Sequence, residues 1–314
     1  MNYGEMGRVN TSPEIMLKEA GFAVSEKCCA RPSCFDFAAR KNGNLILVKI
    51  QPDIDGFSSN DYLELKSIAD FVSAASVLIG ENSREKPLED DTVYSRYNVS
   101  VITSKTFENM IHKAYPLIHA GPGGYYVEIY GETIKKRRQD LGLSVGEIAE
   151  MVGLSRRTLY GYERGMAKAS VATAYNLIYI LGVPVAKPIN LFEKQTSQRR
   201  CLLDTAKSAI AKNKFLQKIC SKFSRYRITA VKKAPFDFII SVPEEKTKII
   251  GGVADRKERK LDERVDEMLS FSKIVKGYAI LIADERNLTD NDIVCIPKEE
   301  LSKIKNPEDL IARI

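Results

Sequence analysis

The chain has 314 residues, of which 44% are hydrophobic and 28% are charged, and its formal net charge is +7. This is an ordinary globular composition, with enough residues for two or three domains that each have a core. No apolar run reaches the roughly 18 residues that cross a bilayer. Residues 1–16 also lack the apolar stretch of a signal peptide, so we expect a cytoplasmic protein without a membrane partner.

The order of the predicted elements from the N-terminus indicates a mixed sheet covered by helices. A helix and a strand come first. A hairpin follows, with Phe35-Asp36-Phe37, a turn at Asn42-Gly43 and an apolar strand. A segment with helical periodicity and two short apolar strands complete this first module. In chain order these elements occupy residues 13–26, 35–50, 61–75, 76–79 and 99–103.

The cysteines and histidines give no local pattern of a metal or catalytic site. Six cysteines occur without a C-x-x-C pair or a neighbouring His, whereas a zinc site normally needs that spacing. Cys28, Cys29 and Cys34 could sense oxidation or hold a metal, but small buried thiols in a reducing cytoplasm are the favoured interpretation. His112 and His119 stand near no nucleophile or carboxylate motif. We expect no catalytic residue, no metal and no cofactor.

Residues 120–132, AGPGGYYVEIYGE, separate the first module from the centre of the chain. Their three glycines, Gly121, Gly123 and Gly124, predict a hinge, and a short strand follows it. We expect this strand to lead into a helical domain.

Residues 144–165, SVGEIAEMVGLSRRTLYGYERG, are the most informative part of the sequence. Ser144 and Glu147 have capping-box spacing, which predicts the start of a helix. Gly153 ends this helix and Ser155 is placed to begin the next one. The inward positions are Ile148, Ala149 and Val152 on the first helix and Leu159 and Tyr162 on the second. This leaves the arginines that begin the second helix on its exposed side.

Over about residues 132–182 the sequence resembles the Cro and lambda-repressor type of helix-turn-helix, often called the Xre family. The resemblance implies that the helix at 155–163 reads the major groove, while the start of the preceding helix approaches phosphates. Val145 departs from the pattern, because the family often has a glutamine there that touches the DNA backbone. The resemblance assigns DNA contacts to Ser144, Ser155, Arg156, Arg157, Thr158, Tyr160 and Gly161.

Charge favours DNA over a helical bundle that packs only against protein. Residues 132–200 contain 12 Lys and Arg against 6 Asp and Glu, a local net charge of +6 out of +7 for the whole chain. A basic excess confined to the motif is the electrostatic footprint expected for phosphate binding. We therefore expect double-stranded DNA as the partner.

The C-terminal part of the chain repeats the first module. A polar, basic segment at 183–200 with Pro184 and Pro188 predicts a linker. The second copy has Phe236-Asp237-Phe238 in its hairpin, and Phe271 and Val275 in its helix match Ile68 and Val72 of the first copy. Its elements occupy residues 213–231, 236–253, 262–277, 279–282 and 293–296.

Both copies resemble the PD-(D/E)XK nucleases, in which an Asp and an acid-x-Lys triplet on the next strand hold magnesium. Asp36 matches the first acid, but the triplet reads Leu47-Val48-Lys49 and lacks its carboxylate. Asp237 is followed by Ile250-Gly251-Gly252, with neither acid nor lysine. Asp53 and Asp55 could supply an acid from elsewhere. We favour inactive sites, in which Asp36 and Asp237 bond within their hairpins and the flanking phenylalanines lie in the core.

The arrangement of the chain also resembles an archaeal group of HTH-type transcriptional regulators over most of its length, most strongly at 121–136, GPGGYYVEIYGETIKK, and 143–165, LSVGEIAEMVGLSRRTLYGYERG. We expect α/β (α+β) modules at 1–120 and 200–314 around an all-α helix-turn-helix domain at 126–185. The predicted function is a sequence-specific, homodimeric DNA-binding transcriptional regulator, not an enzyme, whose effector the sequence does not identify. The alternatives are a nuclease-like enzyme that its helix-turn-helix targets to DNA, and a protein-interaction scaffold.

Overall fold

A computed structural model describes residues 12–193, 214–242, 247–254, 258–284, 293–304 and 306–313 of the chain. The structure divides into two units. Unit 1 holds residues 12–51, 55–78 and the described residues from 191 onward, and unit 2 holds residues 52–54 and 79–190. Unit 1 thus contains most of both repeated modules, and unit 2 contains the helix-turn-helix.

The first copy of the module in unit 1 begins with three antiparallel strands. Asn42 and Gly43 link the second strand to the third with φ of 50° and 85°, the left-handed pair of a two-residue hairpin turn that matches the twist of its strands. The elements are α1 (Pro13–Glu19), β1 (Ala23–Val24), β2 (Phe37–Lys41), β3 (Asn44–Ile50), the 3-10 helix Ile54–Gly56, α2 (Ser59–Val72) and β4 (Ala75–Ile79).

The second copy repeats this order and continues with a parallel strand, which confirms the predicted repeat and the mixed sheet. Strands β12, β13 and β14 are antiparallel, whereas β15 and β16 are added in parallel. The elements are α9 (Lys214–Lys222), β12 (Ile228–Ala230), β13 (Phe238–Val242), β14 (Thr247–Val253), α10 (Leu261–Val275), β15 (Tyr278–Ala283), β16 (Val294–Pro297), a 3-10 helix (Glu300–Lys303) and α11 (Glu308–Ile311).

The two copies pack against each other inside unit 1. Helix α10 lies against β2 of the first copy, and α2 lies against β12 of the second. The buried rings of Phe35, Phe236 and Phe271 meet between them, with centroids 4.9 to 6.4 Å apart. The phenylalanines that flank Asp36 and Asp237 are therefore core residues, as predicted.

The contacts between the copies follow an approximate twofold symmetry. Glu64 on α2 accepts two hydrogen bonds at 2.7 Å, from the backbone N–H groups of Lys232 and Lys233. Glu267 on α10 accepts two at 2.6 and 2.7 Å, from Cys29 and Ala30. Each glutamate stands four residues before the matched pair Ile68 and Phe271. This equivalence confirms the alignment of the two copies.

Unit 2 joins the end of the first copy to the helix-turn-helix through a sheet with the strand order β8-β7-β9-β10-β11. The helices of this unit are α3 (Ser104–Ile111) and the four of the helical bundle, α4 (Gly131–Asp140), α5 (Val145–Val152), α6 (Arg156–Glu163) and α7 (Val171–Leu181). The strands are β5 (Asn82–Ser83), β6 (Lys86–Pro87), β7 (Thr92–Arg96), β8 (Val99–Ile102), β9 (Ile118–Gly121), β10 (Gly124–Val127) and β11 (Ala169–Ser170).

The predicted glycine hinge is wrong, because the glycines form the turn of a hairpin. Gly121 of β9 pairs with Gly124 of β10, and Gly123 has a φ of +85° that lets the chain reverse. Strand β9 also pairs with β7, and β10 pairs with β11 just before α7. Hydrogen-bonded strands therefore connect the helical bundle to the rest of unit 2. Residues 194–200 of the second predicted linker lie outside the described residues.

Candidate nucleic-acid interface

The turn between α5 and α6 is built by caps at both ends. Ser144 Oγ accepts from Glu147 N at 3.2 Å, and Glu147 Oε2 accepts from Ser144 N at 2.7 Å, which is the predicted capping box. The hydrogen bond from Ser144 N to the carboxylate lowers the pKa of Glu147. Gly153 ends α5 with a φ of 74°, and Ser155 Oγ accepts from Thr158 N to begin α6. The predicted turn is confirmed.

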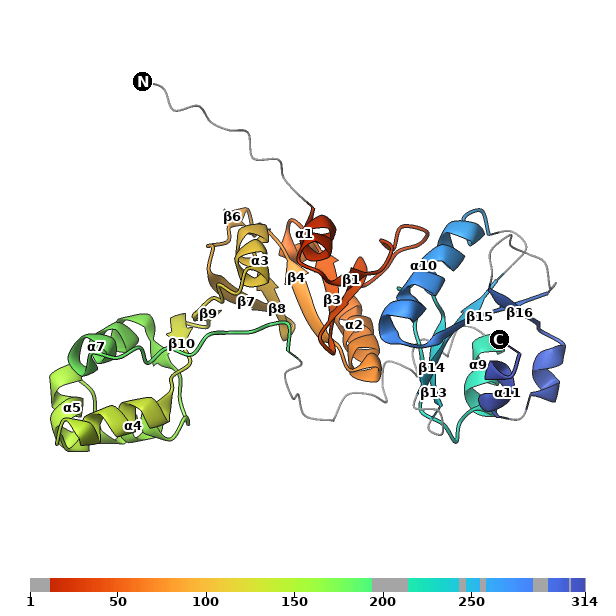
Figure 1. Ribbon diagram of the computed structural model, residues 1–314. Coiled ribbons are helices and arrows are strands. Elements are labelled where there is room, and N and C mark those ends of the chain that lie inside the picture. The colour runs from red at the N-terminus through yellow and green to blue at the C-terminus, as the bar shows by residue number, and fades with distance from the viewer. Residues whose placement is uncertain are drawn as a thin grey trace, which may run out of the picture. The chain divides into compact units, whose positions relative to one another are not determined.

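The inner face of the bundle holds α6 firmly. Figure 1 shows α4, α5 and α7 around a common centre, and all predicted inward residues of α5 and α6 are buried there. Helix α4 begins at Gly131, where an added Cβ would come within 2.4 Å of the Tyr162 carbonyl oxygen. Arg138 of α4 forms a two-point ion pair with buried Glu163 of α6, at 2.6 and 3.1 Å. Helix α6 is thereby fixed to α4 through both packing and charge.

The outer face of α6 begins with two exposed guanidinium groups, Arg156 and Arg157. Arg156 lies across the start of α5, since a Cβ at Gly146 would be 2.9 Å from its Nε. Tyr160 follows one turn later and is 47% exposed. Gly161 is a gap in this face, because a Cβ built there meets nothing within 4 Å.

The remaining predicted contact residues are Ser144 and Ser155, which cap α5 and α6, and Thr158 in the first turn of α6. Ser144 and Ser155 are exposed and Thr158 is half-buried. Ser155 Oγ also lies 2.8 Å from Thr158 Oγ1. These hydroxyls therefore hold the helix starts in shape, and their contact with DNA stays a prediction.

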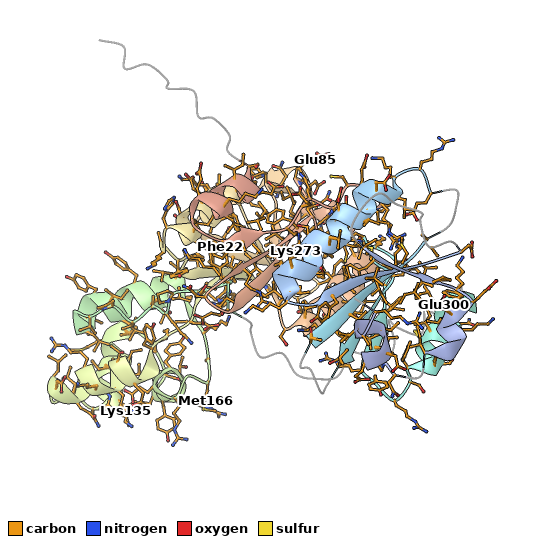
Figure 2. All side chains as sticks on the ribbon, turned by 45° about the vertical axis from the view of Figure 1, so that its right-hand side comes forward. Phe22, Glu85, Lys135, Met166, Lys273 and Glu300 are labelled. Atoms are coloured by element: carbon orange, nitrogen blue, oxygen red, sulfur yellow. The ribbon has the colours of Figure 1, made fainter. Side chains whose placement is uncertain are left out.

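Sequence reasoning missed Arg164. Its guanidinium lies over the ring of Tyr160 at 4.7 Å from the centroid, and the pair extends the cationic face to the end of α6. The signal was present as an aromatic and a cation four residues apart in YGYERG. Lys135 on α4 and Met166 after α6 also project from the bundle (Figure 2), and Met166 is 74% exposed.

The first nuclease-like site is occupied by hydrogen bonds within its own hairpin. Asp36 Oδ2 accepts from Ile50 N at 2.6 Å, and Asp36 Oδ1 pairs with Lys49 Nζ at 3.0 Å. Leu47 is fully buried. Among the described residues no three His, Cys, Asp or Glu side chains are placed to hold a metal, so Asp53 and Asp55 form no such group with Asp36. The interpretation that Asp36 bonds within the hairpin is confirmed.

The second site is filled by an arginine. Asp237 Oδ2 accepts from Val253 N at 2.7 Å, in the same way as Asp36 accepts from Ile50. Arg264 of α10, 1% exposed, then places Nη2 at 2.5 Å from Asp237 Oδ2 and Nη1 at 2.8 Å from Glu258. Its guanidinium lies 3.2 Å from a Cβ built on Gly252. Glycine at the position of Lys49 therefore leaves room for the arginine and for Met268, whose Sδ would lie 2.8 Å from the same Cβ.

The cysteine prediction is only partly right. Cys28 and Cys34 are buried, and burial raises the pKa of both thiols. Cys29, however, is exposed, and its backbone N–H donates to Glu267. Cys201 lies outside the described residues. None of the helices in the described part of the chain has the length and apolarity needed to cross a membrane.

The chain is similar to known proteins along most of its length. Residues 10–116 match the family model described as a PD-(D/E)XK superfamily domain, and residues 134–187 match the model described as Helix-turn-helix. No solved structure gives a significant match.

Three relatives named "Putative HTH-type transcriptional regulatory protein" illustrate the similarity. One from Methanosarcina barkeri is 31% identical over 94% of this chain and 92% of its own. One from Methanocella arvoryzae is 32% identical over 94% and 91%, and one from Pyrococcus furiosus is 27% identical over 97% and 96%. The similarity thus spans both modules as well as the bundle.

Proposed function

The chain belongs to this family of archaeal HTH-type transcriptional regulatory proteins, and we propose that it reads a specific DNA sequence in the major groove with α6. The observation that carries the proposal is the exposed cationic face of Arg156, Arg157 and Arg164, held on a helix whose opposite face is buried. Exposed arginines at the start of such a helix are suited to guanine edges and phosphates. From this function we infer a cytoplasmic location, because the DNA of an archaeon lies in its cytoplasm.

The first test of this function is the replacement of the two leading arginines. Arg156→Ala and Arg157→Ala should each lower the preference for the specific site by about 1 to 3 kcal/mol, because a bidentate contact with guanine is lost. Gel-shift titrations against the specific site and against random DNA measure this preference. Lys135→Ala, at an exposed position of α4, should weaken binding to both kinds of DNA alike. An unchanged ratio of specific to nonspecific affinity in both folded arginine variants would refute α6 as the reader.

Gly161 provides a second test that separates folding from recognition. Because a Cβ at this helical position meets nothing, Gly161→Ala should stabilise the bundle by up to about 1 kcal/mol through helix propensity. If the gap admits a base edge or the DNA backbone, the same variant should bind its site more weakly. Thermal unfolding and gel-shift titration of one preparation give both quantities. Higher stability together with unchanged affinity would remove Gly161 from the interface.

We further propose that the protein acts as a homodimer. A single recognition helix reads only a few base pairs, whereas two half-sites multiply discrimination. The faces of α2 and α10 are already used between the two copies within one chain. Contacts between two chains would therefore use another surface.

A nuclease-like enzyme targeted by its helix-turn-helix is the competing function, and the two occupied sites argue against it. Asp36 is committed to Lys49 and Ile50, and Asp237 to Arg264. We expect no cleavage of supercoiled, linear or branched DNA in the presence of Mg²⁺ or Mn²⁺, because the carboxylates at both sites are already paired with basic side chains. Gel assays with pure protein measure this. Metal-dependent cleavage that Asp36→Ala abolishes would establish the enzyme instead.

A further inference from the structure

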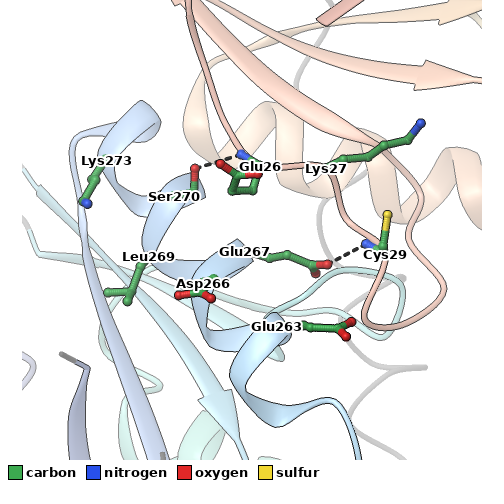
Figure 3. A pocket seen from close by; sticks show the side chains of 9 residues that line it. All are labelled: Glu26, Lys27, Cys29, Glu263, Asp266, Glu267, Leu269, Ser270 and Lys273. Atoms are coloured by element: carbon green, nitrogen blue, oxygen red, sulfur yellow. Dashed lines mark hydrogen bonds between the residues drawn. The ribbon is translucent and has the colours of Figure 1, made fainter. Parts of the chain in front are cut away.

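A polar pocket of about 530 Å³ lies in unit 1, between α10 and the segment of the first copy around residues 26–29. Its volume is that of a small-molecule site. The carboxylates that line it are Glu26, Glu263, Asp266 and Glu267, and the ammonium groups are Lys27 and Lys273. Figure 3 shows Glu267 and Ser270 of α10 facing this segment, with Glu267 bonded to Cys29 and Ser270 bonded to Glu26.

One carboxylate oxygen of Glu267 has no hydrogen-bond donor among the described residues. The residue is only 5% exposed. Its Oε1 accepts from the N–H groups of Cys29 and Ala30, but its Oε2 is buried without any hydrogen-bond partner. A buried carboxylate oxygen without a donor is costly, so a donor is normally supplied by water or by a ligand. Glu267 is one of the residues that line the pocket, and Oε2 is the part of its carboxylate that lacks a donor.

The charge balance of the pocket favours a cation. Four carboxylates face two ammonium groups, and Lys27 also pairs with Glu14 at 3.5 Å. Glu263 is paired with Lys260 at the exposed end. The described residues offer no metal-binding group of His, Cys, Asp or Glu side chains. An organic ammonium compound therefore fits this lining better than an anion or a metal ion.

The spacing of the carboxylates favours more than one positive charge. Glu263 and Glu267 stand four residues apart on α10, a separation of ~5 to 6 Å between Cβ atoms. A four-carbon chain between two ammonium groups matches such a pair, and Leu269 and the lysine stems offer apolar surface to its methylenes. We propose that this pocket binds a small linear diamine or polyamine, with one ammonium group at Glu267 and a second at the outer carboxylates.

Calorimetric titration of the full chain without DNA tests this proposal independently of the DNA-binding function. We expect saturable binding of 1,4-diaminobutane and spermidine at physiological salt. n-Butylamine should bind about tenfold more weakly, since it lacks one charge-assisted contact. Mg²⁺ should not displace the diamine. Absence of saturable diamine binding, or displacement by equimolar Mg²⁺, would overturn the proposal.

Three variants locate the site. Glu267→Gln should weaken diamine binding at least tenfold while its amide oxygen still accepts from Cys29 and Ala30. Glu64→Gln is the matched control, because Glu64 accepts the equivalent two backbone N–H groups and lies outside the pocket. Glu263→Gln, at an exposed position, should also weaken diamine binding. This variant replaces Glu267→Gln as the test if Glu267→Gln does not fold. Equal losses in Glu64→Gln and Glu267→Gln, or unchanged binding in Glu263→Gln, would contradict the assignment.

Discussion

Replacing Arg138 by alanine is expected to destabilise the helix-turn-helix bundle by about 3 to 5 kcal/mol and to remove specific DNA binding with it. The loss follows from Glu163, whose side chain is only 5% exposed and would keep its charge without its partner. Arg138 also donates to the Leu143 carbonyl at 2.9 Å, next to the start of α5. Urea unfolding of the full chain, followed together with a gel-shift titration, measures both effects.

A double replacement distinguishes loss of charge from loss of shape. In Arg138→Met with Glu163→Leu, no buried charge is left unpaired, so most of the stability should return. Arg137→Ala is the control on the same helix, since Arg137 bonds to the Leu181 carbonyl and not to a buried carboxylate among the described residues. If Arg138→Ala unfolds at the same urea concentration as the native chain, the ion pair does not hold α6.

Replacing Arg264 by alanine is expected to destabilise unit 1 to a similar extent, about 3 to 5 kcal/mol, because it strips two carboxylates of a buried cation. Arg264 is 1% exposed and also donates to the carbonyls of Pro235 and Val253 at 2.5 and 3.2 Å. Unfolding by urea, monitored by the Tyr signals of the full chain, reports the loss. DNA affinity of the remaining folded protein should change little, because α6 lies in the other unit.

Arg31 supplies the matched control for Arg264. It pairs with the same carboxylate, Asp237, at 2.9 Å, but its side chain is 23% exposed. Water can replace part of its role, so Arg31→Ala should cost clearly less than Arg264→Ala. Comparable losses in the two variants would mean that burial of the Arg264 guanidinium is not what stabilises the second copy.

Short sequence patterns predicted much of the fold. Asn42-Gly43 identified a hairpin because few residues adopt two successive left-handed conformations. The capping box at Ser144 and Glu147 located α5 because its two hydrogen bonds need only three residues of separation. The glycines near residue 123 were misread, since the same freedom of φ serves a hinge or a tight turn. Only the partner strands, distant in sequence, decide between them.

The pairing of the two copies could not be predicted, because its contacts join residues about 170 to 240 positions apart. Glu64 and Glu267 look like ordinary solvent-facing helix residues in the sequence. Arg264 looks the same, because an arginine is almost never fully buried unless it is paired, and its partner is not visible in the sequence. The glycine at position 252 was the available signal, yet it acquires meaning only when the arginine is seen beside it.

The approximate twofold within unit 1 has a consequence for how the chain can vary. In an assembly of two identical subunits, every substitution appears on both sides of the axis at once. Here the two copies occupy different positions of one chain, so a substitution can alter one copy without altering the other. Glu64 remains a plain structural tie, while Glu267 keeps an oxygen free beside a pocket. Covalent joining of the copies thus lets a symmetric framework evolve an unsymmetric chemistry.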